Sequence, residues 1–221
     1  MCYNKETSLR TFLITLFSSI FLIYRNYEND RLLATIFIAV SLMQLAEYFM
    51  WIDQKCNMIN HYATKFALIV LCIQPLIFLL STYYYGKLTI NKRYVLYLFL
   101  LVLILSSIIT IYTIIYPNQL CTKPRYPRNH LNWDINPILK TIPSILTNLF
   151  FILYFLSPLV LLFLKSKIEG IFYILLYGIT LIFSLYLNRG YGGIWKSYWC
   201  YTANYIPVIA IIFGWFIHKK K

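Results

Sequence analysis

Seven apolar runs constrain this chain more than any other feature of its sequence. A transmembrane helix needs about 20 mostly apolar residues to cross about 30 Å of hydrocarbon, and its backbone groups must pair within the helix. The runs that meet or approach this length are 9–24, 31–52, 65–85, 94–116, 143–164, 171–187 and 205–217. The sequence therefore predicts an all-α, polytopic membrane helix bundle with about seven transmembrane helices.

Composition supports a membrane location for the whole chain. Hydrophobic residues make up 60% of the 221 positions and charged residues only 12%, against about 25% charged in an average soluble domain. A soluble fold of this size has too little interior to bury so much apolar surface. We find no repeat of fixed period and no low-complexity linker, so residues 1–221 are expected to form a single transmembrane bundle.

The Lys and Arg residues responsible for the net charge of +13 lie mainly between the apolar runs. Four connecting segments (25–31, 86–93, 165–170 and 218–221) hold ten Lys and Arg residues in 25 positions, whereas the segments on the other side hold ten in 68. Short loops rich in positive charge stay in the cytosol. We therefore expect the N-terminus outside and the C-terminus in the cytosol, with membrane lipids rather than nucleic acid as partners of the basic residues.

Three cysteines lie in the long loops expected outside. They are Cys56, Cys121 and Cys200. An oxidising compartment would let two of them form a disulfide, although spacing alone does not give the pairing, and free thiols remain the alternative.

Proline interrupts several of the apolar runs. Pro75, Pro143 and Pro158 each remove one helix hydrogen bond and predict kinks. The carbonyl that Pro158 leaves unpaired needs another donor, and Ser157 is the nearest candidate.

Glu47 is the only acidic residue inside a predicted span. An ionisable group there is costly and suggests a functional site. Gln44 and Trp51 share its helix face, and Gln74 and Asn148 on other helices could join it in a shallow, outer-facing polar pocket. The alternative is a structural cluster of hydrogen bonds that holds helices together.

The loop before the last run is rich in glycine and tryptophan. Residues 188–200 contain three of the seven glycines and two of the five tryptophans. Tryptophan favours the headgroup region, so we expect this loop to form an interfacial cap over the bundle.

Motifs for catalysis are missing. No His-Glu-x-x-His or Gly-x-Ser-x-Gly sequence occurs, and His61 and His130 are expected on the opposite side of the membrane from His218. We therefore expect no metal and no cofactor.

Three segments resemble a known family. The stretch Gln44–Cys56, the triplet Ile73-Gln74-Pro75 and the pair Trp199-Cys200 together resemble uncharacterised multipass, seven-helix membrane proteins of giant DNA viruses of the mimivirus type. The resemblance covers most of the chain. It implies the seven-helix fold and a location in host internal membranes or in the lipid layer of the virion, but no particular activity.

Three functions remain open on the sequence. The first is a non-enzymatic membrane protein that binds or passes a small solute or cation through a pocket around Glu47. The second is a structural or assembly protein of a viral membrane, with further copies of the chain as a partner to consider. The third and weaker alternative is an intramembrane lipid-modifying enzyme, which would need His61 and His130 beside Glu47 or Asp53.

Overall fold

The structure, a computed structural model, describes residues 4–125, 130–187, 189 and 194–218. Within these residues, seven helical segments are long and apolar enough to span a membrane. The elements in chain order are α1 (Lys5–Arg25), α2 (Asp30–Ile52), α3 (Met58–Tyr85), α4 (Lys92–Ile115), β1 (Lys123–Arg125), β2 (His130–Asn132), α5 (Asn136–Leu139), α6 (Ser144–Leu156), the 3-10 helix η1 (Ser157–Phe163), α7 (Lys167–Leu187), α8 (Ile194–Ala203) and α9 (Ile206–His218). The predicted all-α membrane bundle is confirmed.

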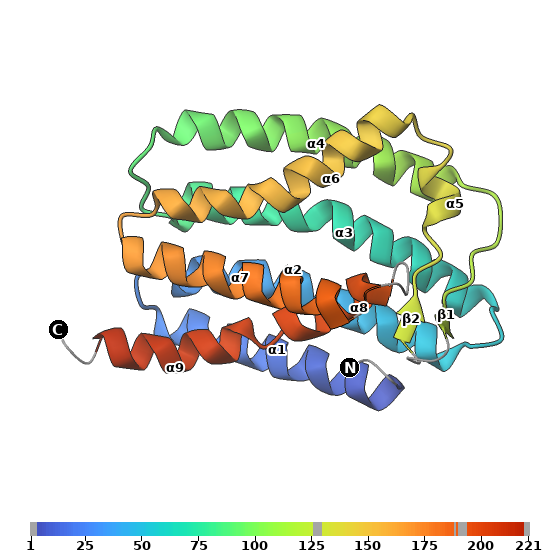
Figure 1. Ribbon diagram of the computed structural model, residues 1–221, viewed down its shortest axis with the longest axis horizontal. Coiled ribbons are helices and arrows are strands. Elements are labelled where there is room, and N and C mark those ends of the chain that lie inside the picture. The colour runs from blue at the N-terminus through green and yellow to red at the C-terminus, as the bar shows by residue number, and fades with distance from the viewer. Residues whose placement is uncertain (1–3, 126–129, 188, 190–193, 219–221) are drawn as a thin grey trace.

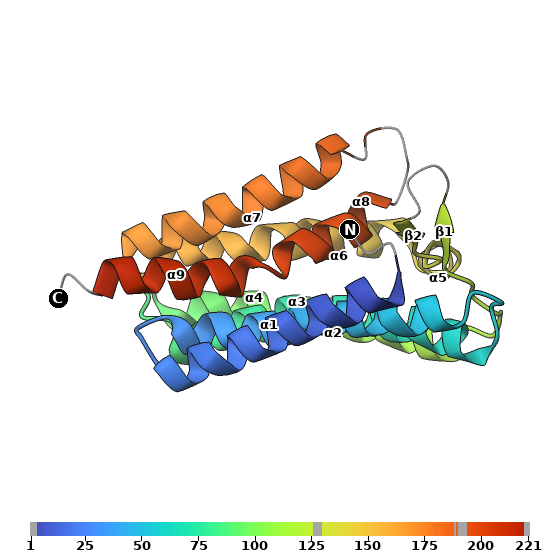
Figure 2. The ribbon, with the colours of Figure 1, turned by 90° about the horizontal axis from the view of Figure 1, so that it is seen from below.

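The long helices run roughly along one axis and form two layers (Figures 1 and 2). One layer contains α1 to α4, each packed against the next along the chain. The other contains α6 to α9, and contacts between α3 and η1 and between α2 and α8 join the layers. Large apolar side chains elsewhere on these helices are exposed, including Tyr97, Ile104, Leu175 and Ile179, as expected for surfaces that face lipid.

Small polar residues form the buried face of α1. Ser8, Thr11, Thr15 and Ser19 recur every three or four residues, and each is at most 1% exposed. Such side chains let helix backbones approach closely in a membrane. The Thr15 hydroxyl donates to the carbonyl of Asn204, 2.9 Å away, which joins α1 to the segment between α8 and α9.

The last membrane segment begins earlier than the sequence predicts. Helix α8 starts at Ile194, within the expected loop, and an apolar segment suited to spanning runs from Ser197 to Phe216. Polar residues lower the hydropathy of this region, yet their side chains bond locally: the Thr202 hydroxyl, for example, donates to the Trp199 carbonyl at 3.0 Å. Trp199, on α8, is 7% exposed and so is buried within the bundle. The expectation that it belongs to an interfacial loop is wrong. The glycines 190, 192 and 193 lie outside the described residues.

Two of the three prolines shape the bundle interior. Pro75 lies inside α3, and Pro158 stands where α6 gives way to η1. The Ser157 hydroxyl donates to the Tyr154 carbonyl at 2.9 Å, the carbonyl that Pro158 leaves without its helix partner. That prediction is confirmed. Pro143 instead caps the start of α6, a position where its missing N–H costs nothing.

A folded connection closes one end of the bundle. The described residues of this connection, 116–125 and 130–143, are called the cap below; they contain the antiparallel strands β1 and β2 and the short helix α5. The cap lies at the right of Figure 1, beside the turn between α2 and α3.

A buried ion pair lies at the opposite end. Arg25 bonds both carboxylate oxygens of Asp30 at 2.7 and 2.8 Å and also donates to the carbonyl of Ile211 at 2.7 Å. Gly214 on α9 leaves room for the guanidinium, since a Cβ there would lie 2.5 Å from it. Two carbonyls of α9, those of Ile211 and Ala210, accept further bonds from this charge, which would be costly if left unpaired.

Candidate functional site

Glu47 is completely buried, near the end of α2 that adjoins the cap. Its side chain is 0% exposed, as is that of Gln44, which lies one turn earlier on α2. The Gln44 amide nitrogen donates to Glu47 Oε2 at 3.1 Å. Trp51, one turn later, is partly buried, and its indole N–H has no hydrogen-bond partner among the described residues. The three residues therefore share a face as expected, but only Gln44 is hydrogen-bonded to the carboxylate.

Trp133 supplies a contact that the sequence did not indicate. Its indole Nε1 donates to Glu47 Oε1 at 2.9 Å, although the two residues are 86 positions apart. Trp133 follows β2 in the cap and is 5% exposed. Both carboxylate oxygens of Glu47 thus accept a hydrogen bond, one from α2 itself and one from the cap.

A disulfide and a buried asparagine position the cap. Cys56, in the turn between α2 and α3, is bonded to Cys121 in the cap. The Asn60 side chain donates to the Thr122 carbonyl at 2.9 Å and accepts from the Thr122 N–H at 2.8 Å. His61 Nδ1 accepts from the Leu120 N–H at 3.1 Å. These bonds fix the chain on the cap side and so determine where Trp133 lies.

Asp53 organises the turn below the cap. It is 6% exposed, and its carboxylate accepts from the Asn60 backbone N–H and the Asn57 side-chain amide, both at 3.1 Å. Burial alone would raise the pKa of Asp53, but these hydrogen bonds and one from the Asn57 backbone outweigh it and lower the pKa. The ionised form of Asp53 therefore stabilises the turn that carries Cys56.

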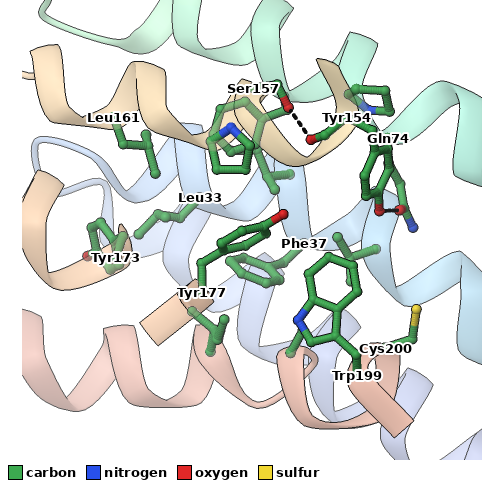
Figure 3. A pocket seen from close by; sticks show the side chains of 17 residues that line it. Leu33, Phe37, Gln74, Tyr154, Ser157, Leu161, Tyr173, Tyr177, Trp199 and Cys200 are labelled. Carbon is green, nitrogen blue, oxygen red and sulfur yellow. Dashed lines mark hydrogen bonds between the residues drawn. The ribbon is translucent and has the colours of Figure 1, made fainter. Parts of the chain in front are cut away.

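A cavity of about 90 Å³ lies between the two helix layers (Figure 3). Its walls come from α2, α3, α6, η1, α7, α8 and the start of α9, and both Pro75 and Pro158 contribute to them. Pro75 lies within the continuous helix α3, whereas Pro158 stands at the change from α6 to η1. Most of the lining is apolar, for example Leu33, Phe37 and Phe78.

Gln74 and Tyr177 bring polar atoms to this cavity. The Tyr154 hydroxyl donates to Gln74 Oε1 at 2.6 Å, while Gln74 Nε2 has no partner among the described residues. The Tyr177 hydroxyl, which points into the space between the layers in Figure 3, also lacks one. Buried polar atoms are normally paired, so two unpaired atoms at one cavity need an explanation.

A second cavity of about 220 Å³ adjoins the first. Tyr154, Trp199 and Cys200 line both, and Trp133 lines only the second. The cavities therefore extend from the two prolines to the indole that is hydrogen-bonded to Glu47. Glu47 itself does not line either cavity.

Other predicted site residues lie elsewhere. Asn148 is exposed on the surface of α6 and is not brought to Glu47. Cys200 is buried with a free thiol, so the expectation that it competes for a disulfide is wrong, whereas the pairing of Cys56 with Cys121 agrees with the expected loop disulfide. Cys200 lies on α8 and packs beside the cap residue Trp133, while Cys121 is already bonded to Cys56.

The two described imidazole side chains have separate partners. His61 bonds the Leu120 backbone, and the His130 ring packs edge-on against Tyr198 at 5.4 Å between ring centres. Among the residues that the structure describes, no three His, Cys, Asp or Glu side chains form a group suited to a metal ion.

Comparison with known proteins adds no relative. A scan against protein-family models and searches of curated proteins and of solved structures found no match to this chain. The site must therefore be interpreted from its own geometry.

Proposed function

We propose that this chain is a non-enzymatic, multipass membrane protein that binds a small molecule between its two helix layers. The observation that carries the proposal is the cavity beside Tyr177, a space lined by helices from both layers with a buried hydroxyl that has no protein partner in the described chain. Ligand pockets are typically apolar with a few polar groups that fix orientation.

Glu47 has a supporting role in this proposal. Its two oxygens are occupied by Gln44 and Trp133, and it is fully buried. That geometry favours a structural carboxylate that holds the cap against the bundle. It gives less support to passage of a cation, for which a carboxylate should be open to water.

Benzene is a suitable probe of the cavity, because engineered apolar cavities of about 150 Å³ bind it. We expect benzene to raise the unfolding temperature of the wild type in detergent and to leave the unfolding temperature of the Ala203→Leu variant unchanged. Ala203 is 7% exposed and lines the cavity, so a larger side chain there should occupy the space. No benzene-dependent shift in the wild type would refute the proposal.

A structural or assembly protein of a viral membrane is the second candidate. The tight packing of the Glu47 carboxylate favours it, because a hydrogen-bond cluster that holds helices needs no opening. On this alternative the protein would lie in host internal membranes or in the virion membrane, and further copies of the chain would be its partner. Wild-type stability that is insensitive to benzene, together with assembly of the purified chain into oligomers, would favour this candidate.

The orientation of the chain is part of the proposal. We place the cap and the N-terminus outside the cytosol, because loops at the other end are denser in Lys and Arg and because the disulfide between Cys56 and Cys121 suits an oxidising compartment. Labelling of Cys2 by an impermeant maleimide in sealed cells tests this, with Cys2→Ser as the control for labelling at other cysteines. Labelling of this cysteine only after the cells are permeabilised would show the opposite orientation.

A further inference from the structure

We infer that the cavity takes a neutral, lipid-soluble molecule that carries a hydrogen-bond acceptor such as a carbonyl oxygen. This inference rests on the proposed function, since it names the chemical class of the ligand for the same cavity. Three properties of the cavity support it: its unpaired donors, its lack of charge and its position among membrane-spanning helices.

The unpaired polar atoms favour an acceptor on the ligand. Gln74 is 7% exposed, and its amide oxygen already accepts from Tyr154, so only its nitrogen remains, and an amide nitrogen can only donate. The Tyr177 hydroxyl has a proton to donate and no acceptor among the described residues. A carbonyl oxygen has two lone pairs and can accept from either donor.

The rest of the lining excludes a charged ligand. None of the described residues that line the cavity is acidic or basic. An ion there would lose its hydration without gaining a counter-charge, which is costly in a membrane interior. Apolar walls such as Phe37 and Ile206 instead favour a hydrocarbon body.

The size of the cavities fits a molecule about as large as a substituted ring. The first cavity holds about 90 Å³, and the adjoining one, behind Tyr154 and Trp199, holds about 220 Å³. Together they just reach the lower limit of about 300 Å³ for ligand pockets. A molecule of this class would reach the site from the surrounding lipid, where it is concentrated.

Two probes of the same shape test the acceptor directly. Acetophenone carries a carbonyl where α-methylstyrene carries a methylene group, so the pair differs by a single acceptor. Binding would be measured by equilibrium dialysis against protein in nanodiscs, with empty nanodiscs used to subtract the share dissolved in lipid. We expect the wild type to bind acetophenone about fivefold more tightly than α-methylstyrene, the ratio that one net hydrogen bond provides.

Tyr177→Phe removes the donor but keeps the ring. It should weaken acetophenone binding by about fivefold and leave α-methylstyrene binding unchanged. Tyr186→Phe is the matched control, because Tyr186 lies on the same helix and is 72% exposed. That variant should bind both probes like the wild type.

The outcomes separate this inference from the proposed function. If both probes bind equally well, or if Tyr177→Phe weakens both to the same extent, the cavity binds ligands but the acceptor is not recognised, and only the inference fails. If neither probe binds the wild type, the proposed function fails and the inference fails with it. Tyr177→Phe keeps the ring and its packing and removes only the hydroxyl, so the test measures the hydrogen bond alone.

Discussion

Replacing Glu47 by leucine should destabilise the protein by removing the link between α2 and the cap. The change leaves two buried donors, the Trp133 indole N–H and the Gln44 amide, without their acceptor. A buried donor left unpaired costs about 1–3 kcal/mol when the unfolded chain exposes it to water. Between membrane helices the value averages only about 0.6 kcal/mol, since the unfolded chain finds other partners there.

The two donors therefore carry different weights. Trp133 lies in the cap, outside the spans, so the larger value applies to it, whereas Gln44 lies within α2 and takes the smaller value. We expect Glu47→Leu to lower the free energy of unfolding by about 2–4 kcal/mol. Glu47→Gln keeps one acceptor oxygen for Trp133 and loses only the contact with Gln44, so it should cost about 0.6 kcal/mol.

A double-mutant cycle isolates the contact with Trp133. Unfolding in mixed micelles, driven by an increasing fraction of denaturing detergent and followed by circular dichroism, gives the four free energies for wild type, Glu47→Leu, Trp133→Phe and the double variant. We expect a coupling energy of about 1–2 kcal/mol, within the range for residues in direct contact. A coupling energy near zero, or a loss below about 0.5 kcal/mol for Glu47→Leu, would refute the reasoning.

Three further predictions concern other parts of the structure. Cys56→Ser opens a disulfide that closes a loop of 65 residues, and should lower stability by about 2–4 kcal/mol; adding reductant to the wild type should have the same effect on its unfolding temperature. The lowered pKa of Asp53 means that its contribution to stability is complete above the ordinary aspartate pKa and is lost as the pH falls through the lower folded-state pKa. Asp53→Asn should therefore show a smaller loss of stability in acid than the wild type, and identical pH profiles would contradict this. Gly214→Ala places a Cβ 2.5 Å from the guanidinium of Arg25 and should cost about 1–3 kcal/mol, whereas Gly178→Ala, with no atom within 4 Å, should be neutral or slightly stabilising in the same unfolding assay.

The helices could be predicted from the sequence because lipid imposes a length on each apolar run. Pro158 illustrates how far this reasoning extends, since the need to pair a freed carbonyl correctly identified Ser157 as its donor. The start of α8 could not be found in this way. Polar residues such as Thr202 and Asn204 lower the hydropathy of this region, and a hydropathy pattern does not show that their side chains bond to carbonyls of α8 itself.

The contact between Trp133 and Glu47 depends on long-range geometry. Its register is set by Asn60 and by the disulfide of Cys56, and neither the pairing nor the path of the cap follows from local patterns. The connection also carries buried apolar residues such as Leu131 and Ile135, so nothing in the sequence singles out Trp133 as the partner of Glu47. The cavity is likewise a product of assembly, because it forms where Pro75 and Pro158 from separate helices face a common space.

An experimental structure of the protein in lipid nanodiscs tests the central claim most directly. The account predicts seven membrane-embedded helical segments and non-protein density within hydrogen-bond distance of the Tyr177 hydroxyl, between the two helix layers. Side chains that fill this space, with the Tyr177 hydroxyl bonded to another part of the protein, would contradict it.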